Sequence, residues 1–231
     1  MNDSQPTYTG LDVLKILDAA TNYNSLLLDL ILQSAGDRRR MLDFGAGIGT
    51  FSKALRAKGA EVICLESDPY LAEGLARDGF QTLRHLNEVQ DGSFEFIFAL
   101  NVLEHIEHDL ATTQCLAAKL KRDGRLLIYV PAFQCLWTSL DEKVKHHRRY
   151  RRMALERLIR SAGLSLRKSR YGDSLGFFAA LGFKILGNKR GDISPRAISF
   201  YDRYIVPPSK ALDPLLGRLF GKNVYVVASK N

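Results

Sequence analysis

One short stretch, Met41 to Thr50, constrains the fold of this chain more than any other feature of the sequence. It opens with an apolar run and continues into three glycines at alternate positions, Gly45, Gly47 and Gly49. An amphipathic segment, 51–58, follows directly. A buried strand, a tight glycine turn and a helix N-terminus, in this order, are how an α/β sheet meets a nucleotide-like ligand.

The spacing of the glycines separates this turn from a dinucleotide site. Dinucleotide folds carry G-x-G-x-x-G, with a pyrophosphate at the helix N-terminus. Here the glycines alternate, and Asp43 stands two residues before the first of them. A carboxylate at that place suits a cationic amino group better than a pyrophosphate. The pattern therefore disfavours a nicotinamide-dependent oxidoreductase.

Further apolar runs indicate that the turn belongs to a larger parallel sheet. The run 61–66 ends in Glu66, 17 residues after Gly49. An acid at the end of the second strand is where a Rossmann-like fold accepts hydrogen bonds from ribose hydroxyls. Later runs at 94–100 and 125–130 are separated by helical segments. This alternation predicts a parallel sheet with right-handed crossovers.

The glycine motif resembles the first motif of the class I S-adenosylmethionine-dependent methyltransferases. The phrases NVLEHI at 101–106 and LKRDGRLLIYVPA at 120–132 are similar to later segments of that superfamily. The resemblance implies an α/β, Rossmann-like, doubly wound and mostly parallel seven-stranded sheet with an antiparallel last strand. It also implies an N-terminal helical lid, a helical insertion before the last strand, and S-adenosyl-L-methionine as cofactor.

We expect a single domain over residues 1–231. Two helices, 11–19 and 24–35, are predicted ahead of the first strand. The expected divisions are a helical cap at 1–36, a cofactor core with the acceptor loop at 37–171, a helical insertion at 172–222 and the last strand at 223–231.

The resemblance implies that the cofactor contacts the ends of the early strands. Asp43 is expected to help fix the methionine amino end, and Glu66 to hold both ribose hydroxyls. Glycines let the cofactor approach without a Cβ in the way. Many relatives carry an Asp near the adenine, where this chain offers Leu86 and Asn87. The expected cofactor-binding residues are Asp43, Gly45, Ala46, Gly47, Gly49, Glu66, Ser67, Leu86, Asn87, Asn101 and Val102.

Charge divides the chain into two unlike halves. Residues 1–118 hold 9 Lys/Arg and 17 Asp/Glu, a net of −8, whereas residues 119–231 hold 24 and 8, a net of +16. The later strands of such folds shape the acceptor pocket, so a basic field there favours an anionic acceptor. The alternative is a basic surface that is simply solvated.

The basic residues are concentrated at 143–152, after a loop that carries the only tryptophan, Trp137. Within this segment, His-x-Arg-Arg-Tyr resembles one bacterial branch of the methyltransferases, whose usual wording is Gly-His-Tyr-Arg-Arg-Tyr. The chain departs from it at Lys145 and His147. An RNA-binding run or a helix-capping surface cluster is the competing interpretation. The expected substrate-binding residues are Tyr23, Trp137, Arg148, Arg149 and Tyr150; Tyr23 comes from an Asn-Tyr-Asn phrase expected just before a helix.

Catalysis needs a general base only if the acceptor is a hydroxyl, an amide or another weakly acidic group. His146 is the preferred candidate and His105 the second, because imidazole titrates near neutrality. His105 has the competing role of bracing its motif loop. No metal is expected: the three cysteines have no ligand spacing and are interpreted as reduced residues of a cytoplasmic protein.

The function predicted from these patterns is methyl transfer to a small-molecule or lipid- or glycan-linked, anionic acceptor. RNA methylation is the main enzymatic alternative, and a non-catalytic binding or scaffold protein that keeps the fold is another. The apolar stretch 175–187 is too short to span a bilayer. Its aromatic residues and the basic turn 188–191 leave open peripheral contact with the inner face of a bacterial membrane. The acceptor atom and the oligomeric state are left open.

Overall fold

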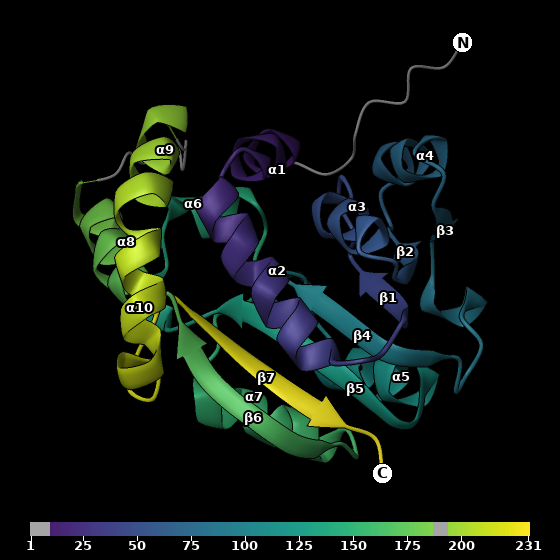
Figure 1. Ribbon diagram of the computed structural model, residues 1–231. Helices are drawn as coiled ribbons and strands as arrows, with labels where there is room; N and C mark the ends of the chain where they lie inside the picture. Colours follow the sequence, from purple (N-terminus) through teal and green to yellow (C-terminus); the bar gives the residue numbers. More distant parts are fainter. Residues whose placement is uncertain (1–9, 187–193) are drawn as a thin grey trace.

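A single sheet organises the protein, as the computed structural model, which describes residues 10–186 and 194–231, shows. Its seven strands run in the order β3-β2-β1-β4-β5-β7-β6 (Figure 1). All neighbouring strands pair in parallel except β7, which is antiparallel to both β5 and β6. The fold class predicted from the sequence is confirmed. The strands are β1 (Arg40–Phe44), β2 (Glu61–Leu65), β3 (Gln81–Leu83), β4 (Phe94–Leu100), β5 (Leu120–Pro131), β6 (Ser165–Gly172) and β7 (Asn223–Ser229).

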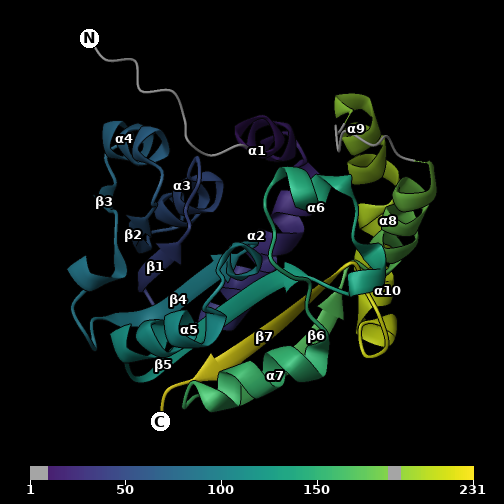
Figure 2. The ribbon, with the colours of Figure 1, turned by 180° about the vertical axis from the view of Figure 1, so that it is seen from behind.

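Helices cover both faces of the sheet, which is why the central strands are apolar on both sides. On one face, Ile31 of α2 and Leu55 of α3 pack in a core cluster with Phe96 and Phe98 of β4. The opposite face carries α5 and α7 (Figure 2). The helices are α1 (Leu11–Asp18), α2 (Thr21–Ala35), α3 (Thr50–Ala57), α4 (Pro69–Arg77), α5 (Asp109–Lys119), α6 (Ser139–Lys143), α7 (Arg152–Ser161), α8 (Ser174–Leu186), α9 (Pro195–Tyr204) and α10 (Val206–Leu216), with 3₁₀ turns η1 (Leu86–Glu88), η2 (Leu103–His105) and η3 (Gln134–Leu136).

The second N-terminal helix begins earlier than the sequence predicted. The Asn-Tyr-Asn phrase, expected just before a helix, lies inside the first turn of α2. The backbone N–H groups of Asn22 and Tyr23 donate to the carboxylate of Asp202 in α9, at 3.1 and 2.8 Å. First-turn N–H groups have no partner within their own helix, so a carboxylate there stabilises it. A partner about 180 residues away along the chain is invisible to a local pattern.

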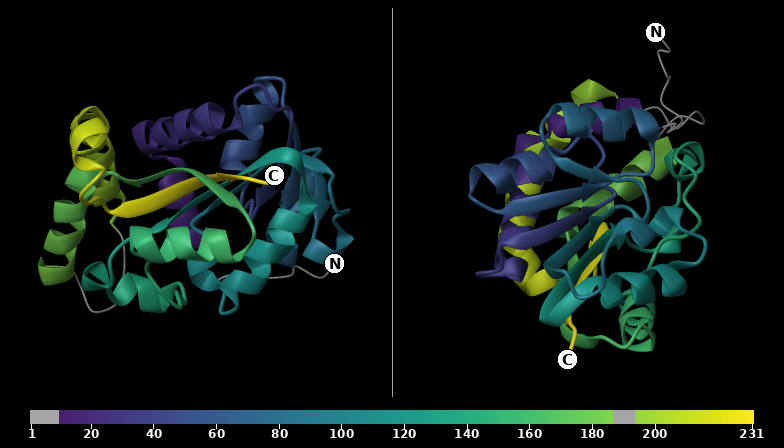
Figure 3. Two further views of the ribbon diagram at one scale, coloured as in Figure 1. Left: turned by 90° about the horizontal axis from the view of Figure 1, so that it is seen from below. Right: turned by 90° about the vertical axis from the view of Figure 1, so that its right-hand side faces the viewer.

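The segment between β6 and β7 folds into α8, α9 and α10, which gather at one end of the sheet (Figure 3). The basic turn expected at 188–191 lies outside the described residues. Pro207 and Pro208 fall in the first turn of α10, where a missing N–H costs no helical hydrogen bond. α10 packs against α8, α9 and α2, so the insertion and the N-terminal helices form one layer.

Alanine at Gly45 is expected to destabilise the fold more than alanine at Gly92. Both glycines have positive φ, +79° and +63°. A Cβ at Gly45 meets a Val102 methyl group at 2.4 Å, whereas one at Gly92 meets nothing within 4 Å. Gly92→Ala should therefore cost only the left-handed backbone term, about 1–2 kcal/mol. Gly45→Ala should add about 1–3 kcal/mol of overpacking.

Urea unfolding of the two variants and the wild type measures this difference directly. Equal losses of stability would show that the turn or Val102 shifts to accommodate the new Cβ without an energetic cost, which would contradict the prediction.

Candidate active site

The site lies at the carboxyl ends of the parallel strands, around the boundary between β1 and β4. From β1 the sheet is built outward through β2 and β3, and from β4 in the other direction through β5. Connections from the two central strands therefore leave to opposite sides and open a crevice between them, where ligands of doubly wound sheets bind. The residues that follow β1, β2, β4 and β5 meet at this edge.

The glycine turn after β1 is held tightly against β2. The N–H groups of Gly45 and Ala46 both donate to the carbonyl of Leu65, at 2.8 and 3.1 Å. Gly45, Gly47 and Gly49 all have positive φ. The Cβ clash at Gly45 shows that the turn leaves no room for a side chain on the Val102 side. The turn is thus closely packed within the protein, and its contact with the predicted cofactor stays a prediction.

Glu66 ties the end of β2 to the glycine turn. Its Oε2 accepts the N–H of Gly47 at 2.8 Å and its Oε1 accepts the N–H of Asp68 at 2.9 Å. Burial raises the pKa of this carboxyl, although these N–H donors oppose the rise. A carboxylate has about four acceptor sites. Glu66 is thus oriented by backbone groups and keeps acceptor capacity for ribose hydroxyls, so its surroundings fit the predicted role.

Asp43 is buried at the end of β1 and has an internal partner. Its Oδ2 accepts the hydroxyl of Ser52 in α3 at 2.7 Å. Burial raises the pKa of Asp43 to about 7, although the Ser52 hydrogen bond opposes the rise. Asp43 therefore joins β1 to the helix that follows the turn. Its contact with a methionine amino group stays a prediction.

The predicted adenine side is formed by the ends of β2 and β3. The guanidinium of Arg84 donates to the carbonyl of Ser67, at 2.7 Å from Nη2. Leu86 and Asn87 lie in η1, and Leu86 packs against the core cluster under the sheet edge. Both residues stand beyond β3, next to the end of β2, as expected from the order of the strands.

Asn101 and Val102 leave β4 through a strained backbone. Asn101 has φ of +53°, and its N–H donates to the carbonyl of Tyr129 at 2.8 Å. The amide of Asn223, at the start of β7, donates to the Asn101 side chain at 3.5 Å. Positive φ is uncommon outside glycine and often marks functional positions.

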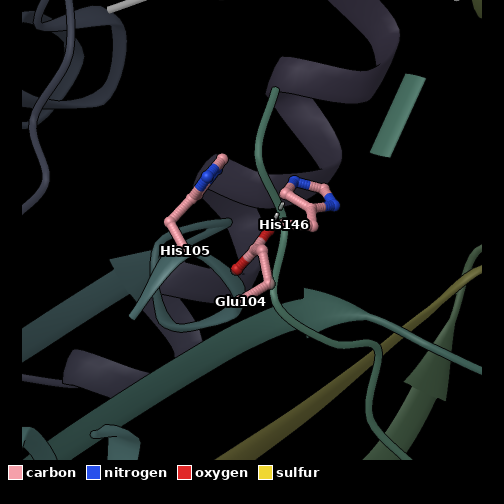
Figure 4. A group of neighbouring side chains, drawn as sticks. All are labelled: Glu104, His105 and His146. Carbon is pink, nitrogen blue, oxygen red and sulfur yellow. Dashed lines mark ion pairs between the residues drawn. The ribbon is translucent and has the colours of Figure 1, made fainter. Parts of the chain in front are cut away.

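The two candidate bases lie together, with a buried acid between them (Figure 4). Glu104 and His105 lie in the 3₁₀ turn η2, and α5 begins only at Asp109. The rings of His105 and His146 are 4.5 Å apart. Burial lowers the pKa of His105 to about 4, aided by His146. Burial also raises the pKa of Glu104, which has no exposed surface, to about 8.

Asp141 organises the acceptor loop. Its carboxylate accepts hydrogen bonds from Nδ1 of His146 at 2.8 Å and from Nε and Nη2 of Arg149 at 2.8 and 2.9 Å. Burial alone would raise the pKa of Asp141, but these hydrogen bonds outweigh it and hold the pKa below its ordinary range. The ring of Trp137 lies 6.5 Å from that of His146. The sequence offered one signal for Asp141, a Thr-x-x-Asp capping box that begins at Thr138.

The other two predicted substrate residues of this segment also have internal partners. Arg148 forms an ion pair with Asp109 at 2.8 Å and donates to the carbonyl of Glu107. Tyr150 is buried, and its hydroxyl donates to Asp109 at 2.8 Å. In the described structure Arg148, Arg149 and Tyr150 brace the loop to the start of α5 and to Asp141. Direct contact of these residues with an acceptor stays a prediction.

Sequence reasoning missed a second polar cluster at the same edge, around Lys222. The Lys222 ammonium donates to the Tyr201 hydroxyl at 2.9 Å and pairs with Asp173 at 3.2 Å. It also lies 4.9 Å above the ring of Tyr23, whose hydroxyl is 3.2 Å from that of Tyr129. Burial opposes the charge, but the Tyr201 and Asp173 oxygens outweigh it and raise the pKa of Lys222. Tyr23, the predicted substrate residue on α2, belongs to this cluster.

Curated proteins resemble parts of this chain. The bifunctional biotin biosynthesis protein BioHC of Cellvibrio japonicus is 29% identical over an alignment of 146 residues, which covers 55% of this chain and 28% of that protein. A ubiquinone biosynthesis O-methyltransferase of Xanthomonas oryzae is 30% identical over 117 residues, 46% of each chain. The chain thus spans less than half the length of these curated relatives.

Solved structures resemble the fold over nearly the whole chain. A SAM-dependent methyltransferase of Archaeoglobus fulgidus superimposes with a TM-score of 0.62 at 17% identity, covering 92% of this chain and 95% of that one. Geranyl diphosphate C-methyltransferase of Streptomyces coelicolor A3(2) gives 0.64 at 15% identity, covering 94% and 83%. A methyltransferase domain family matches residues 18–169. The chain therefore belongs to the methyltransferase domain family, with S-adenosylmethionine, as the sequence predicted, for its cofactor.

Proposed function

We propose that this protein moves a methyl group from S-adenosylmethionine to a small-molecule or lipid- or glycan-linked, anionic acceptor. The observation that carries the proposal is the hydrogen bond from the Gly47 N–H to the Glu66 carboxylate, beside the boundary between β1 and β4. It holds a carboxylate in a fixed orientation next to a turn whose glycines carry no Cβ. The same two features are what a cofactor with an amino acid end and a ribose needs.

The chain's own residues contribute chiefly by holding the reactants. S-adenosylmethionine, when bound, would supply a methyl carbon on a sulfonium: the acceptor's lone pair would form the new bond as the C–S bond breaks, and the two electrons of the C–S bond would stay on sulfur. Most of the acceleration in such a displacement comes from proximity and alignment. We assign cofactor orientation to Glu66, Asp43 and the glycine turn, and acceptor orientation to residues after β4 and β5. A hydroxyl acceptor would also lose a proton, for which we assign His146 as the base.

The distribution of charge supports an anionic acceptor. Lys222, at the acceptor edge, is already paired with Asp173 at 3.2 Å. The half of the chain after residue 118 nevertheless carries a net charge of +16. We therefore favour a carboxylate or phosphate on the acceptor. We also assign His146, Arg148, Arg149 and Tyr150 to the bacterial branch with the His-x-Arg-Arg-Tyr segment.

Helices α8 to α10 support a lipid-linked acceptor and contact with the inner membrane surface of a bacterial cell. They expose large apolar side chains, among them Phe178 at 56% and Leu219, just beyond α10, at 70%. Among residues 10–186 and 194–231, no helix has the length and apolar character that crossing a bilayer requires. Gathered apolar side chains next to an acceptor edge suit a peripheral contact with lipid.

Calorimetric titration with S-adenosylmethionine, S-adenosylhomocysteine and NAD tests the cofactor assignment. The wild type should bind both adenosyl ligands at micromolar affinity and leave NAD unbound. Glu66→Ala leaves the ribose hydroxyls without their acceptor, so binding should weaken by about 1–3 kcal/mol. Glu61→Ala, an exposed acid at the start of β2, is the control and should bind normally.

Undiminished binding by Glu66→Ala would remove Glu66 from the site. If neither adenosyl ligand binds the wild type, the fold serves a non-catalytic role instead.

Sedimentation with vesicles that contain phosphatidylglycerol tests the membrane contact. The rings of Phe177 and Phe178 both pack against Phe220, so their loss would disturb the fold. We therefore choose the double variant Leu215→Ser/Leu219→Ser, which removes side chains that are 74% and 70% exposed. It should bind vesicles more than about tenfold more weakly through lost apolar burial.

Met153→Ser removes a side chain that is 72% exposed on α7, a helix outside the 172–222 insertion, and should bind like the wild type. A wild-type protein that stays in the supernatant would refute the membrane contact.

A further inference from the structure

We propose that Glu104, His105 and His146 form a binding site for one divalent transition-metal cation. One potential ligand atom from each residue lies within 4.8 Å of the other two. Glu104 and His105 are adjacent in the 3₁₀ turn after β4, while His146 comes from the loop after β5 (Figure 4). The two segments meet only because β4 and β5 are neighbours in the sheet.

The carboxylate of Glu104 is the strongest argument for a cation. It is fully buried, and no other residue of the described chain donates a hydrogen bond to either oxygen. The guanidinium of Arg149 is already committed to Asp141 through two nitrogens. A buried carboxylate without a partner is costly. A bound cation would compensate this charge.

The surroundings of both histidines have the arrangement that orients metal ligands. Nδ1 of His146 lies 2.8 Å from the Asp141 carboxylate, and Nε2 faces Glu104 at 3.9 Å. A ring N–H of His105 donates to the backbone carbonyl groups of residues 144 and 145. Metal-ligating histidines characteristically donate their other N–H to a carboxylate or a backbone carbonyl. Arg149 in turn holds Asp141, so the outer partners are themselves fixed.

The donor set selects the class of cation. Two imidazole nitrogens and one carboxylate oxygen suit Zn²⁺ and its first-row neighbours, whereas Mg²⁺ and Ca²⁺ prefer oxygen ligands. Bonds of about 2.0–2.2 Å bring the donor atoms to about 3.0–3.5 Å from one another. The three donor atoms lie within 4.8 Å of one another, with 3.9 Å between His146 and Glu104, so binding requires them to close by up to about 1.5 Å. This proposal departs from the expectation of no metal drawn from the sequence.

Three protein ligands leave coordination positions open at the acceptor edge. Resting on the proposed function, we assign these positions to an oxygen-bearing acceptor. A cation there lowers the pKa of a bound hydroxyl, so that its proton can pass to solvent before the oxygen attacks the methyl carbon. His146 then acts as a ligand rather than as the free base that the sequence suggested.

Metal titration of the full-length, tag-free protein after treatment with a chelator tests the site without any acceptor. Zn²⁺ calorimetry should give one ion per chain at micromolar affinity or tighter. Co²⁺ should quench the fluorescence of Trp137, which is the only tryptophan and lies 6.5 Å from the His146 ring. Zn²⁺ should also raise the melting temperature of the wild type.

Variants distinguish this site from adventitious binding. Glu104→Gln preserves the shape of the buried side chain and should weaken Zn²⁺ binding at least tenfold and abolish the thermal shift. His146→Ala should do the same. His147→Ala, which removes an exposed neighbouring histidine, should bind Zn²⁺ and quench like the wild type.

The proposal is overturned if the wild type does not bind Zn²⁺, if Glu104→Gln binds it equally well, or if Mg²⁺ is preferred. Titration with S-adenosylhomocysteine on the same samples separates this failure from failure of the proposed function. A protein that binds the adenosyl ligand but no Zn²⁺ keeps the function and returns His146 to the role of a base.

Discussion

Parallel pairing of β1 with both β2 and β4 is the constraint on which the rest of the structure depends. Parallel strands end at the same edge, and the two central strands send their connections to opposite faces. The glycine turn, Glu66, Asn101 and the histidine cluster meet for this reason, although they are spread over about a hundred residues. Antiparallel β7 then brings its first residues, and Lys222 just before them, to the same edge.

Buried carboxylates fix the segments around this edge. Glu66 closes the glycine turn, Asp202 receives the first turn of α2, and Asp141 holds the acceptor loop through Arg149 and His146. Each accepts more than one N–H group. Buried, charge-assisted hydrogen bonds of this kind are stronger than exposed ion pairs. The Glu104 carboxylate breaks the pattern, since it is as buried as the others yet no other residue of the described chain donates a hydrogen bond to it. The metal proposal follows from that exception.

Local sequence patterns were enough to predict the sheet. Strands such as 94–100 are continuous apolar runs, and the alternate glycines with Glu66 lie close together in the chain. The acceptor side was harder, because its polar groups find partners across the fold. The residues next to Arg149 in the sequence do not indicate that its guanidinium donates to Asp141. Likewise, the residues next to Lys222 do not indicate that its ammonium lies between the rings of Tyr23 and Tyr201.

The sequence by itself determined the class of fold and the family, because these follow from hydrophobic periodicity and from motifs contained in a few consecutive residues. Only the tertiary structure decided which charged groups are already paired and which are left without a partner. Burial and pairing depend on neighbours distant in the chain: His146 lies near Glu104 because β4 and β5 are adjacent, and Asp202 lies at α2 because the insertion folds back over the sheet.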